Sequence, residues 1–393
     1  MTGRESRYQA YLESRAAAGL DRHLLPVGRS DARTIEVDGR RYVNLSSNDY
    51  LGLSAHPDLI ERARDWTARF GAGSAASRLV TGNLDVFMGL ERKVARLKAK
   101  PAALILASGF QANAAVLQAL LDRKILGAEP LVFADRLNHA SMHFGCSAAG
   151  ARQLRYRHCD PDHLAQLLTK HAASERPKFI LTESVFSMDG DVAPMDEIVA
   201  LAKAYDALVV CDDAHATGVL GEGGQGLSGG ADVVIGTFSK ALGSYGAFVA
   251  CSETVRDYLV NACAGLIYST ALPPAVLGAM DAALDLLPSL EPERRKVAGL
   301  AGRFRAAAHA LGYDTGASST QIVPLMAGPA EAALDLSARL REAGLWATAI
   351  RPPTVPKGTA RLRLAFSAAH GDGDLDALLN VLAAHALPKK VTA

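Results

Sequence analysis

The 393-residue sequence has few cysteines, and their number and spacing exclude several classes of protein. There are five, an odd number, with no Cys-x-x-Cys pair: Cys146, Cys159, Cys211, Cys251 and Cys263. Such a pattern disfavours a disulfide framework or a zinc site and fits a reducing compartment. We therefore expect no structural metal and a cytoplasmic location.

Long apolar runs and an excess of charge of one sign are also lacking. No apolar stretch approaches the roughly 18–20 residues that span a bilayer, and residues 1–26 lack the continuous apolar segment of a signal peptide. Lys and Arg number 42 against 41 Asp and Glu. This balance gives no indication of a nucleic-acid partner or a membrane surface.

Between residues 46 and 290, short apolar runs alternate with helical stretches such as Met195–Tyr205. Continuous apolar runs separated by helices are typical of a mostly parallel sheet covered on both faces, an α/β fold. A ligand is then expected at the carboxyl ends of the strands. The predicted strands are Ala103–Leu106, Leu131–Ala134, Phe179–Leu181, Ala207–Cys211 and Val233–Ile235.

The two ends of the chain have a different character. A helix is expected from about Tyr8 to Ala18, followed by short strands at Thr34–Val37 and Tyr42–Leu45. After Pro292 the mixture of helices and strands predicts a smaller α+β domain. The expected division is an N-terminal segment over residues 1–45, a large domain over 46–290 and a C-terminal domain over 291–393.

Two neighbouring segments carry the chemistry. Lys240 lies in Thr-Phe-Ser-Lys-Ala-Leu-Gly, and Asp212-Asp-Ala-His215 ends an apolar run upstream. A lysine amine can form an imine with an aldehyde cofactor, and a carboxylate can hold a pyridinium nitrogen protonated, so the pair suggests pyridoxal 5'-phosphate (PLP). His215 could then bond the phenolic oxygen of that cofactor, leaving Asp213 a structural role. Taken alone, Asp212 would more often be a helix cap or a satisfied strand end.

Hydroxyl groups and a helix start are candidates for binding the cofactor phosphate. Gly109 and Phe110 open a helical stretch after the strand Ala103–Leu106, where free N–H groups and the helix dipole favour an anion. Thr237 and Ser239 precede Lys240 and could add hydroxyls. A plain strand-to-helix turn would explain the first segment equally well.

A histidine and several arginines complete the candidates. The ring of His139, after the strand Leu131–Ala134, could stack on a pyridine, although a loop histidine is more often a satisfied surface or core residue. Arg351 precedes a proline-rich turn that would hold its guanidinium for a carboxylate, although a surface ion pair is the commoner fate. Arg361 and Arg363 alternate with leucines and are expected to face solvent or an interface.

One glycine motif points elsewhere. Gly221-Glu-Gly-Gly-Gln-Gly226 matches the G-x-G-x-x-G dinucleotide fingerprint, but it neither directly follows a strand nor opens a helix. A nicotinamide dehydrogenase is therefore disfavoured. The sequence also contains no Walker loop, which disfavours a P-loop site for a nucleoside triphosphate.

The combination of motifs resembles the α-oxoamine synthases, fold-type I PLP enzymes that join an amino acid to an acyl thioester with loss of carbon dioxide. The resemblance extends from about Leu24 to His370. Its motifs are Ser47–Leu53, Gly71–Gly82, Asn138–Ser141, Glu183–Asp191, Asp212–His215, Thr237–Lys240, Tyr268–Pro274 and Ile350–Pro356.

The resemblance implies roles for single residues. Lys240 would be the Schiff-base lysine, Asp212 the partner of the ring nitrogen, His215 that of the phenolic oxygen, and His139 the stacking ring. Ser187 would lie near the same oxygen. Thr237, Ser239, Gly109 and Phe110 would contact the phosphate, with Thr270 reaching it across a dimer interface. The implied substrate contacts are Arg351, Asn48, Ser77, Arg22 and Thr354.

The branch of the family most like this chain joins L-alanine to a pimeloyl thioester, carried by CoA or by acyl carrier protein, on the way to biotin. A homodimer with active sites at the interface is implied. The alternative is the branch that joins glycine to acetyl-CoA, or another α-oxoamine synthase. A catalytically inactive partner subunit is disfavoured because Lys240 is present.

Overall fold

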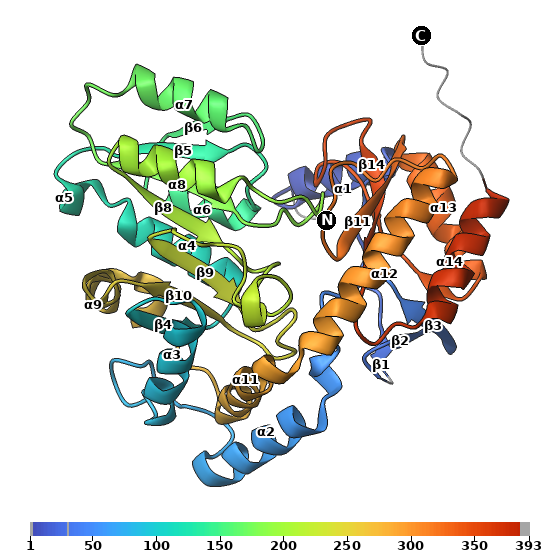
Figure 1. Cartoon of the computed structure of the whole chain (residues 1–393), viewed down its shortest axis with the longest axis horizontal. Helices are drawn as coiled ribbons and strands as arrows, with labels where there is room; N and C mark the ends of the chain where they lie inside the picture. The colour runs from blue at the N-terminus through green and yellow to red at the C-terminus, as the bar shows by residue number, and fades with distance from the viewer. Residues whose placement is uncertain (1–2, 30, 386–393) are drawn as a thin grey trace.

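The computed structural model describes residues 3–29 and 31–385, so residues 1, 2, 30 and 386–393 of the expected end segments lie outside the described part (Figure 1). A seven-stranded sheet forms the centre. Its strands, in spatial order, are β4 (Ala102–Leu106), β10 (Ala247–Cys251), β9 (Val233–Thr237), β8 (Ala207–Asp212), β7 (Lys178–Glu183), β5 (Leu131–Asp135) and β6 (Gln153–Tyr156).

The predicted mostly parallel sheet is confirmed. All five predicted strands are present, and β6 and β10 are additional. β10 runs antiparallel to both β4 and β9, while the other neighbours are parallel. β6 is an edge strand whose sequence Gln-Leu-Arg-Tyr is only partly buried, so it lacks the continuous apolar run that marks the others.

Both faces of the central sheet are buried. Along β4, Ala103 and Ile105 belong to one apolar cluster, and the alternate residues Leu104 and Leu106 belong to another, as the two-residue period of a strand requires. The first cluster includes side chains from α2 (Pro57–Phe70), α3 (Val86–Leu97), α7 (Pro161–Lys170), α8 (Met195–Ala204) and α11 (Pro274–Leu286). The second includes α4 (Gly109–Leu120), α6 (Ala140–Ala148), α9 (Glu253–Ala262) and α10 (Ala264–Ile267).

The C-terminal part has its own core. The long helix α12 (Glu291–Ala310) leads to a three-stranded sheet, which α13 (Ala330–Glu342) contacts (Figure 1). That sheet contains β11 (Ile322–Gly328), β14 (Ala360–Ala365) and β13 (Ala349–Ile350), and α14 (Asp372–Ala384) packs against α12. Phe304, Leu325, Leu364 and Leu378 meet in its apolar cluster.

The N-terminal strands lie beside this C-terminal part rather than apart from it. β3 (Arg40–Asn44) pairs in parallel with β12 (Leu345–Trp346), and Leu45 belongs to the C-terminal apolar cluster. The same sheet holds β1 (Gly28–Arg29) and β2 (Thr34–Val37).

Two helices, α1 (Ser6–Ala17) and the short α5 (Arg123–Leu126), bury no residue. The division at residues 45 and 290 stays a prediction. Among the described residues, no helix has the length and apolar character needed to cross a bilayer.

Candidate active site

A cavity of about 800 Å³ opens where the central strands end and the C-terminal part meets them. It gathers Lys240, His215, His139, Ser187 and Asn48, which the sequence placed in five separate motifs. Arg22 and Thr354 also line it. The cavity is also lined by residues to which the sequence analysis assigned no role in the site: Ser46, Arg136, Leu137, Asn138, Ala140, His143, Met188, Thr348, Ile350, Pro353 and Arg363.

Lys240 follows β9 and presents its amine to this cavity. Burial lowers the pKa of the amine to about 8, although the nearby carboxylates of Asp212 and Glu183 act in the opposite direction. A lysine with such a pKa has a substantial neutral fraction near neutrality. It can therefore act as a nucleophile or as a base.

Asp212 is the last residue of β8 and is only 7% exposed. Its two oxygens accept hydrogen bonds from the Asn113 side chain (2.6 Å) and the Ala214 backbone (2.9 Å). Glu183 is its register partner on β7; burial, reinforced by the Asp212 charge, raises the pKa of Glu183 well above its usual range. The neutral, protonated form of Glu183 is thus favoured.

His215 is a buried, neutral ring. Burial, with Lys240 and Arg363 nearby, holds its pKa well below the usual range. Its Nδ1 shares a hydrogen bond of 2.7 Å with the hydroxyl of Tyr50, which also bonds Asn48 Oδ1 at 3.0 Å. Tyr50 lies in the Ser47–Leu53 motif, but nothing in the sequence indicated a role for its hydroxyl.

The expectation that Arg361 and Arg363 face solvent or an interface is wrong: they are 4% and 7% exposed. Arg363 lines the cavity and donates to Asn48 Oδ1 (3.1 Å), to the Tyr50 hydroxyl (3.3 Å) and to the Ser187 carbonyl. Arg361 pairs with Asp189. Their face of β14 is covered by loops distant in sequence, which alternation along one strand cannot reveal.

Arg351 lies elsewhere. Its guanidinium donates to the carbonyl of Gly19, and it is not among the residues that line the cavity. The residues after it do reach the cavity: Thr354 lines it and accepts a hydrogen bond of 3.2 Å from Arg22. A buried guanidinium is thus supplied by Arg363, and Arg351 is a partly exposed neighbour of the N-terminal segment.

His139 and Ser187 stand on two loops of the cavity wall. His139 caps α6 and shares a hydrogen bond of 2.6 Å with the Ser141 hydroxyl through Nδ1. Ser141 also accepts from Asn113, the residue that bonds Asp212. The His139 loop is thereby linked to the carboxylate at the end of β8.

The segments expected to bind phosphate converge. A Cβ placed on Gly109 would lie 3.8 Å from the Cβ of Thr237, so the first turn of α4 faces the end of β9. The hydroxyls of Thr237 and Ser239 lie 2.7 Å apart. Phe110, in the same turn, is 49% exposed. Hydroxyl groups beside a helix N-terminus are an arrangement suited to an anion.

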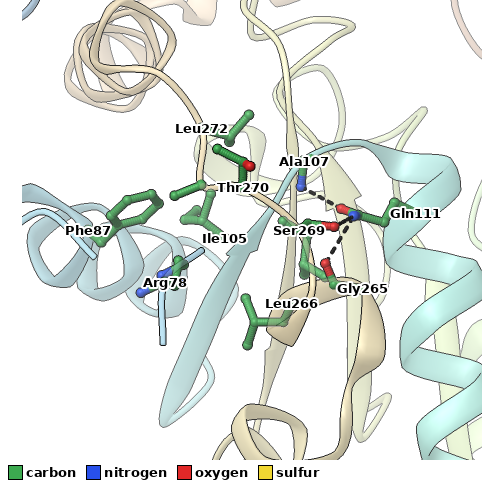
Figure 2. Close-up of a pocket in the computed structure, with 12 residues that line it drawn as sticks. Arg78, Phe87, Ile105, Ala107, Gln111, Gly265, Leu266, Ser269, Thr270 and Leu272 are labelled. Atoms are coloured by element: carbon green, nitrogen blue, oxygen red, sulfur yellow. Dashed lines mark hydrogen bonds between the residues drawn. The ribbon is translucent and has the colours of Figure 1, made fainter. Parts of the chain in front are cut away.

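Thr270 and Ser77 do not line the cavity. They face each other in an isolated antiparallel bridge, and Thr270 lies in a smaller pocket with Arg78 and Gln111 (Figure 2). Gln111 Nε2 donates to the Gly265 carbonyl (3.0 Å) and the Ser269 hydroxyl (2.7 Å), which fixes this segment against the start of α4.

The glycine motif 221–226 has a structural function. Its backbone wraps around a buried ion pair between Lys98 and Asp213, and Lys98 also donates to the Gln225 carbonyl (2.6 Å). A Cβ on Gly226, which has a φ of +89°, would overlap the Asp213 carboxylate. The structural role expected for Asp213 agrees with these contacts.

The groups present fit PLP. An amine of lowered pKa suits its aldehyde, a buried carboxylate suits its pyridine nitrogen, and Thr237, Ser239 and the start of α4 suit its phosphate. A serine palmitoyltransferase solved with PLP superposes on the chain with a TM-score of 0.91 at 27% identity, covering 97% of each chain. The fold and the cavity define the class of fold-type I PLP-dependent transferases.

Comparison with known proteins narrows the class. A family model described as aminotransferase class I and II matches residues 40–382, and the chain belongs to that family. It is 55% identical to the putative 8-amino-7-oxononanoate synthase of Paramagnetospirillum magneticum, over 96% of this chain and 97% of the relative. It is 54% identical to the 8-amino-7-oxononanoate synthase of Gluconacetobacter diazotrophicus, over 97% of each.

Proposed function

We propose that the chain catalyses the reaction for which these relatives are named. It joins L-alanine to a pimeloyl thioester, either pimeloyl-CoA or pimeloyl-acyl carrier protein, and releases 8-amino-7-oxononanoate, carbon dioxide and the free thiol, a step of biotin biosynthesis. The observation that carries the proposal is that one cavity holds a lysine amine with a pKa of about 8 and a buried arginine, Arg363.

We assign the cofactor contacts as follows. Bound PLP supplies an imine-forming aldehyde and an electron sink beside the amino-acid Cα. Lys240 would hold the aldehyde, and its neutral amine would accept the proton from the amino-acid Cα. Asp212 would keep the ring nitrogen protonated, His215 and Ser187 would contact the phenolic oxygen, and His139 would cover the ring.

The substrate carboxylate is assigned to Arg363. This side chain is buried and always charged, and it donates a hydrogen bond to Asn48, which is itself an expected substrate contact. Because the carboxylate leaves as carbon dioxide after condensation, its binding site must release it. When the carboxylate leaves, Arg363 keeps its hydrogen bonds to Asn48, Tyr50 and the Ser187 carbonyl. Arg22 and Thr354, at the outer wall, are assigned to the acyl substrate.

Ser77 and Thr270 are assigned to the active site of a second subunit, with Thr270 reaching the phosphate there. The exposed apolar side chains of Leu79, Val80 and Tyr268, which neighbour them in sequence, support this assignment, since such surfaces mark interfaces. We infer a homodimer. The cysteines are all unpaired, which supports the cytoplasmic location.

Thiol release by cofactor-loaded protein tests the proposal. Release should be faster with L-alanine and pimeloyl-CoA than with glycine and acetyl-CoA. The opposite order would assign the chain to the glycine-using branch. If neither pair releases thiol, pimeloyl-acyl carrier protein is the next donor, and failure of that pair as well would refute the proposal.

A further inference from the structure

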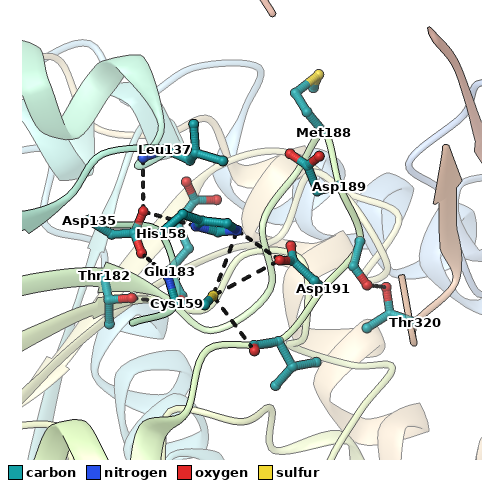
Figure 3. A network of polar contacts seen from close by, with 12 residues as sticks. Asp135, Leu137, His158, Cys159, Thr182, Glu183, Met188, Asp189, Asp191 and Thr320 are labelled. Carbon is teal, nitrogen blue, oxygen red and sulfur yellow. Dashed lines mark hydrogen bonds and ion pairs between the residues drawn. The ribbon is translucent and has the colours of Figure 1, made fainter. Parts of the chain in front are cut away.

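His158 lies two residues beyond β6 and bridges two aspartates. Its Nδ1 is 3.0 Å from Asp135 Oδ1, and its Nε2 is 2.7 Å from Asp191 Oδ2 (Figure 3). The ring packs edge-on against Phe186, with the centroids 4.3 Å apart. None of these contacts belongs to the cavity lining, and the proposed reaction makes no direct use of His158.

Both ring nitrogens face a carboxylate, so both donate, and the ring is an imidazolium. Burial alone would lower the pKa of His158. The hydrogen bonds to Asp135 and Asp191 outweigh burial and raise this pKa to about 12. Asp135 is 1% exposed and Asp191 8%. Hydrogen bonds between buried charged groups are short, strong and directional, and they resist displacement of either partner.

Each aspartate lies next to a different segment that lines the cavity. Asp135 ends β5 and accepts from the backbone N–H of Leu137 (2.9 Å), at the start of the turn that carries His139. Asp191 closes the loop that carries Ser187: Phe186 N–H donates to the Asp191 carbonyl (3.1 Å), and Gly190 N–H donates to the Phe186 carbonyl (2.9 Å).

We propose that His158 is a positioning residue that sets the separation of the His139 turn and the Ser187 loop, and hence the width of the active-site cavity between them. The inference deepens the proposed function and rests on it for the kinetic readout alone. The geometric claim concerns the two loops and holds whatever the substrates are.

Three other side chains that hold the Ser187 loop come from the C-terminal part of the chain. Arg361 pairs with Asp189, Arg363 donates to the Ser187 carbonyl, and the Thr320 hydroxyl donates to the Gly190 carbonyl (2.9 Å). His158 instead connects the loop to the central sheet. Without it, Asp191 would be a buried carboxylate lacking its cation, and such a group is strongly unfavourable.

Two substitutions separate the two hydrogen bonds. The amide nitrogen of Asn falls near the position of the histidine Nδ1, and that of Gln near Nε2. His158→Asn should keep the bond to Asp135 and release Asp191, whereas His158→Gln should keep Asp191 and weaken the bond to Asp135. Asp135 retains the backbone N–H groups of Leu137 and Cys159, so the effect of Gln should be smaller.

Hydrogen exchange followed by mass spectrometry reads the loops without using activity. In His158→Asn, amides of residues 184–193 should exchange at least about tenfold faster, with residues 135–142 little changed; in His158→Gln the larger change should be in 135–142. The matched control is His309→Asn, which loses a 2.7 Å contact to Thr315, a residue of neither loop, and should alter neither segment. Should His158→Asn fail to fold, Asp191→Asn, which keeps an acceptor oxygen, should show a smaller increase confined to 184–193.

Two further readouts connect the loops to the cofactor. In cofactor-saturated His158→Asn, the visible circular dichroism per bound cofactor should change, and kcat should fall by about ten- to a hundredfold, as displacement of a site by about 1 Å allows.

A uniform rise in exchange along the chain, or unchanged exchange in both variants, would overturn the proposal. So would stoichiometric zinc in the purified protein, because His158 Nε2, the Cys159 thiol (3.7 Å away) and Asp191 would then be metal ligands. If the loops respond as expected but no substrate pair reacts in the wild type, only the proposed function fails.

Discussion

Replacing Arg363 by lysine should impair binding of L-alanine and leave the fold intact. Arg363 is 7% exposed and lines the cavity. Its guanidinium already donates hydrogen bonds to Asn48 Oδ1, the Tyr50 hydroxyl and the Ser187 carbonyl. Lysine keeps the charge but loses the planar fork that binds a carboxylate through two parallel bonds. Loss of one charged hydrogen bond costs about 1.5–3 kcal/mol, which corresponds to an increase of about 10- to 150-fold in the KM for L-alanine.

The assay is thiol release at saturating pimeloyl thioester with L-alanine varied, and Arg351→Lys is the control. Arg351 donates to the Gly19 carbonyl and does not line the cavity, so its replacement should change the KM for L-alanine less than about threefold. A large effect at Arg351 with a small one at Arg363 would refute the assignment. It would return the carboxylate to the position that the proline-rich motif suggested.

Three further predictions concern buried cations. Lys240→Ala should reduce turnover by at least about a thousandfold, and borohydride should no longer fix the cofactor to the protein; residual fixation would show that another lysine holds it. Lys98→Met leaves Asp213 buried without its cation and should lower the free energy of unfolding in urea by about 3–5 kcal/mol. Lys93 pairs with Asp281 and Asp285 and its side chain is 25% exposed, so Lys93→Met should cost about 1 kcal/mol or less; equal losses would contradict this difference. In cofactor-free protein, burial holds the pKa of Lys240 at about 8, against about 10.5 when exposed, so the unfolded chain binds more protons between these values. The free energy of unfolding should therefore rise between pH 8 and 10.5, and a rise of the same size in Lys240→Met would contradict the shift.

Local sequence was sufficient to predict the groups that follow buried strands. Apolar runs located the central strands, and the polar residues directly after them, Asp212 and His139, necessarily gathered at one edge of a parallel sheet. Lys240 follows β9 in the same way. These placements depend on strand order and direction, which short connections largely fix.

Contacts between distant segments could not be predicted in the same way. Arg363 alternates with leucines on β14, a pattern typical of a strand with one wet face, yet the loops at residues 48 and 187 cover that face. The two hydrogen bonds of His158 likewise join residues 23 and 33 positions away. Which loop covers which strand is decided by tertiary packing, so one sequence without its structure leaves such residues indistinguishable from surface charges.

The central claim is a condensation that removes the carboxylate of L-alanine. The most direct test incubates the cofactor-loaded protein with pimeloyl-CoA and L-alanine labelled with ¹³C at either C1 or C2, and measures carbon dioxide and product by mass spectrometry. The C1 label should leave as carbon dioxide in proportion to thiol released, while the C2 label should be retained in 8-amino-7-oxononanoate. Retention of the C1 label in a condensed product, or thiol release without labelled carbon dioxide, would contradict it.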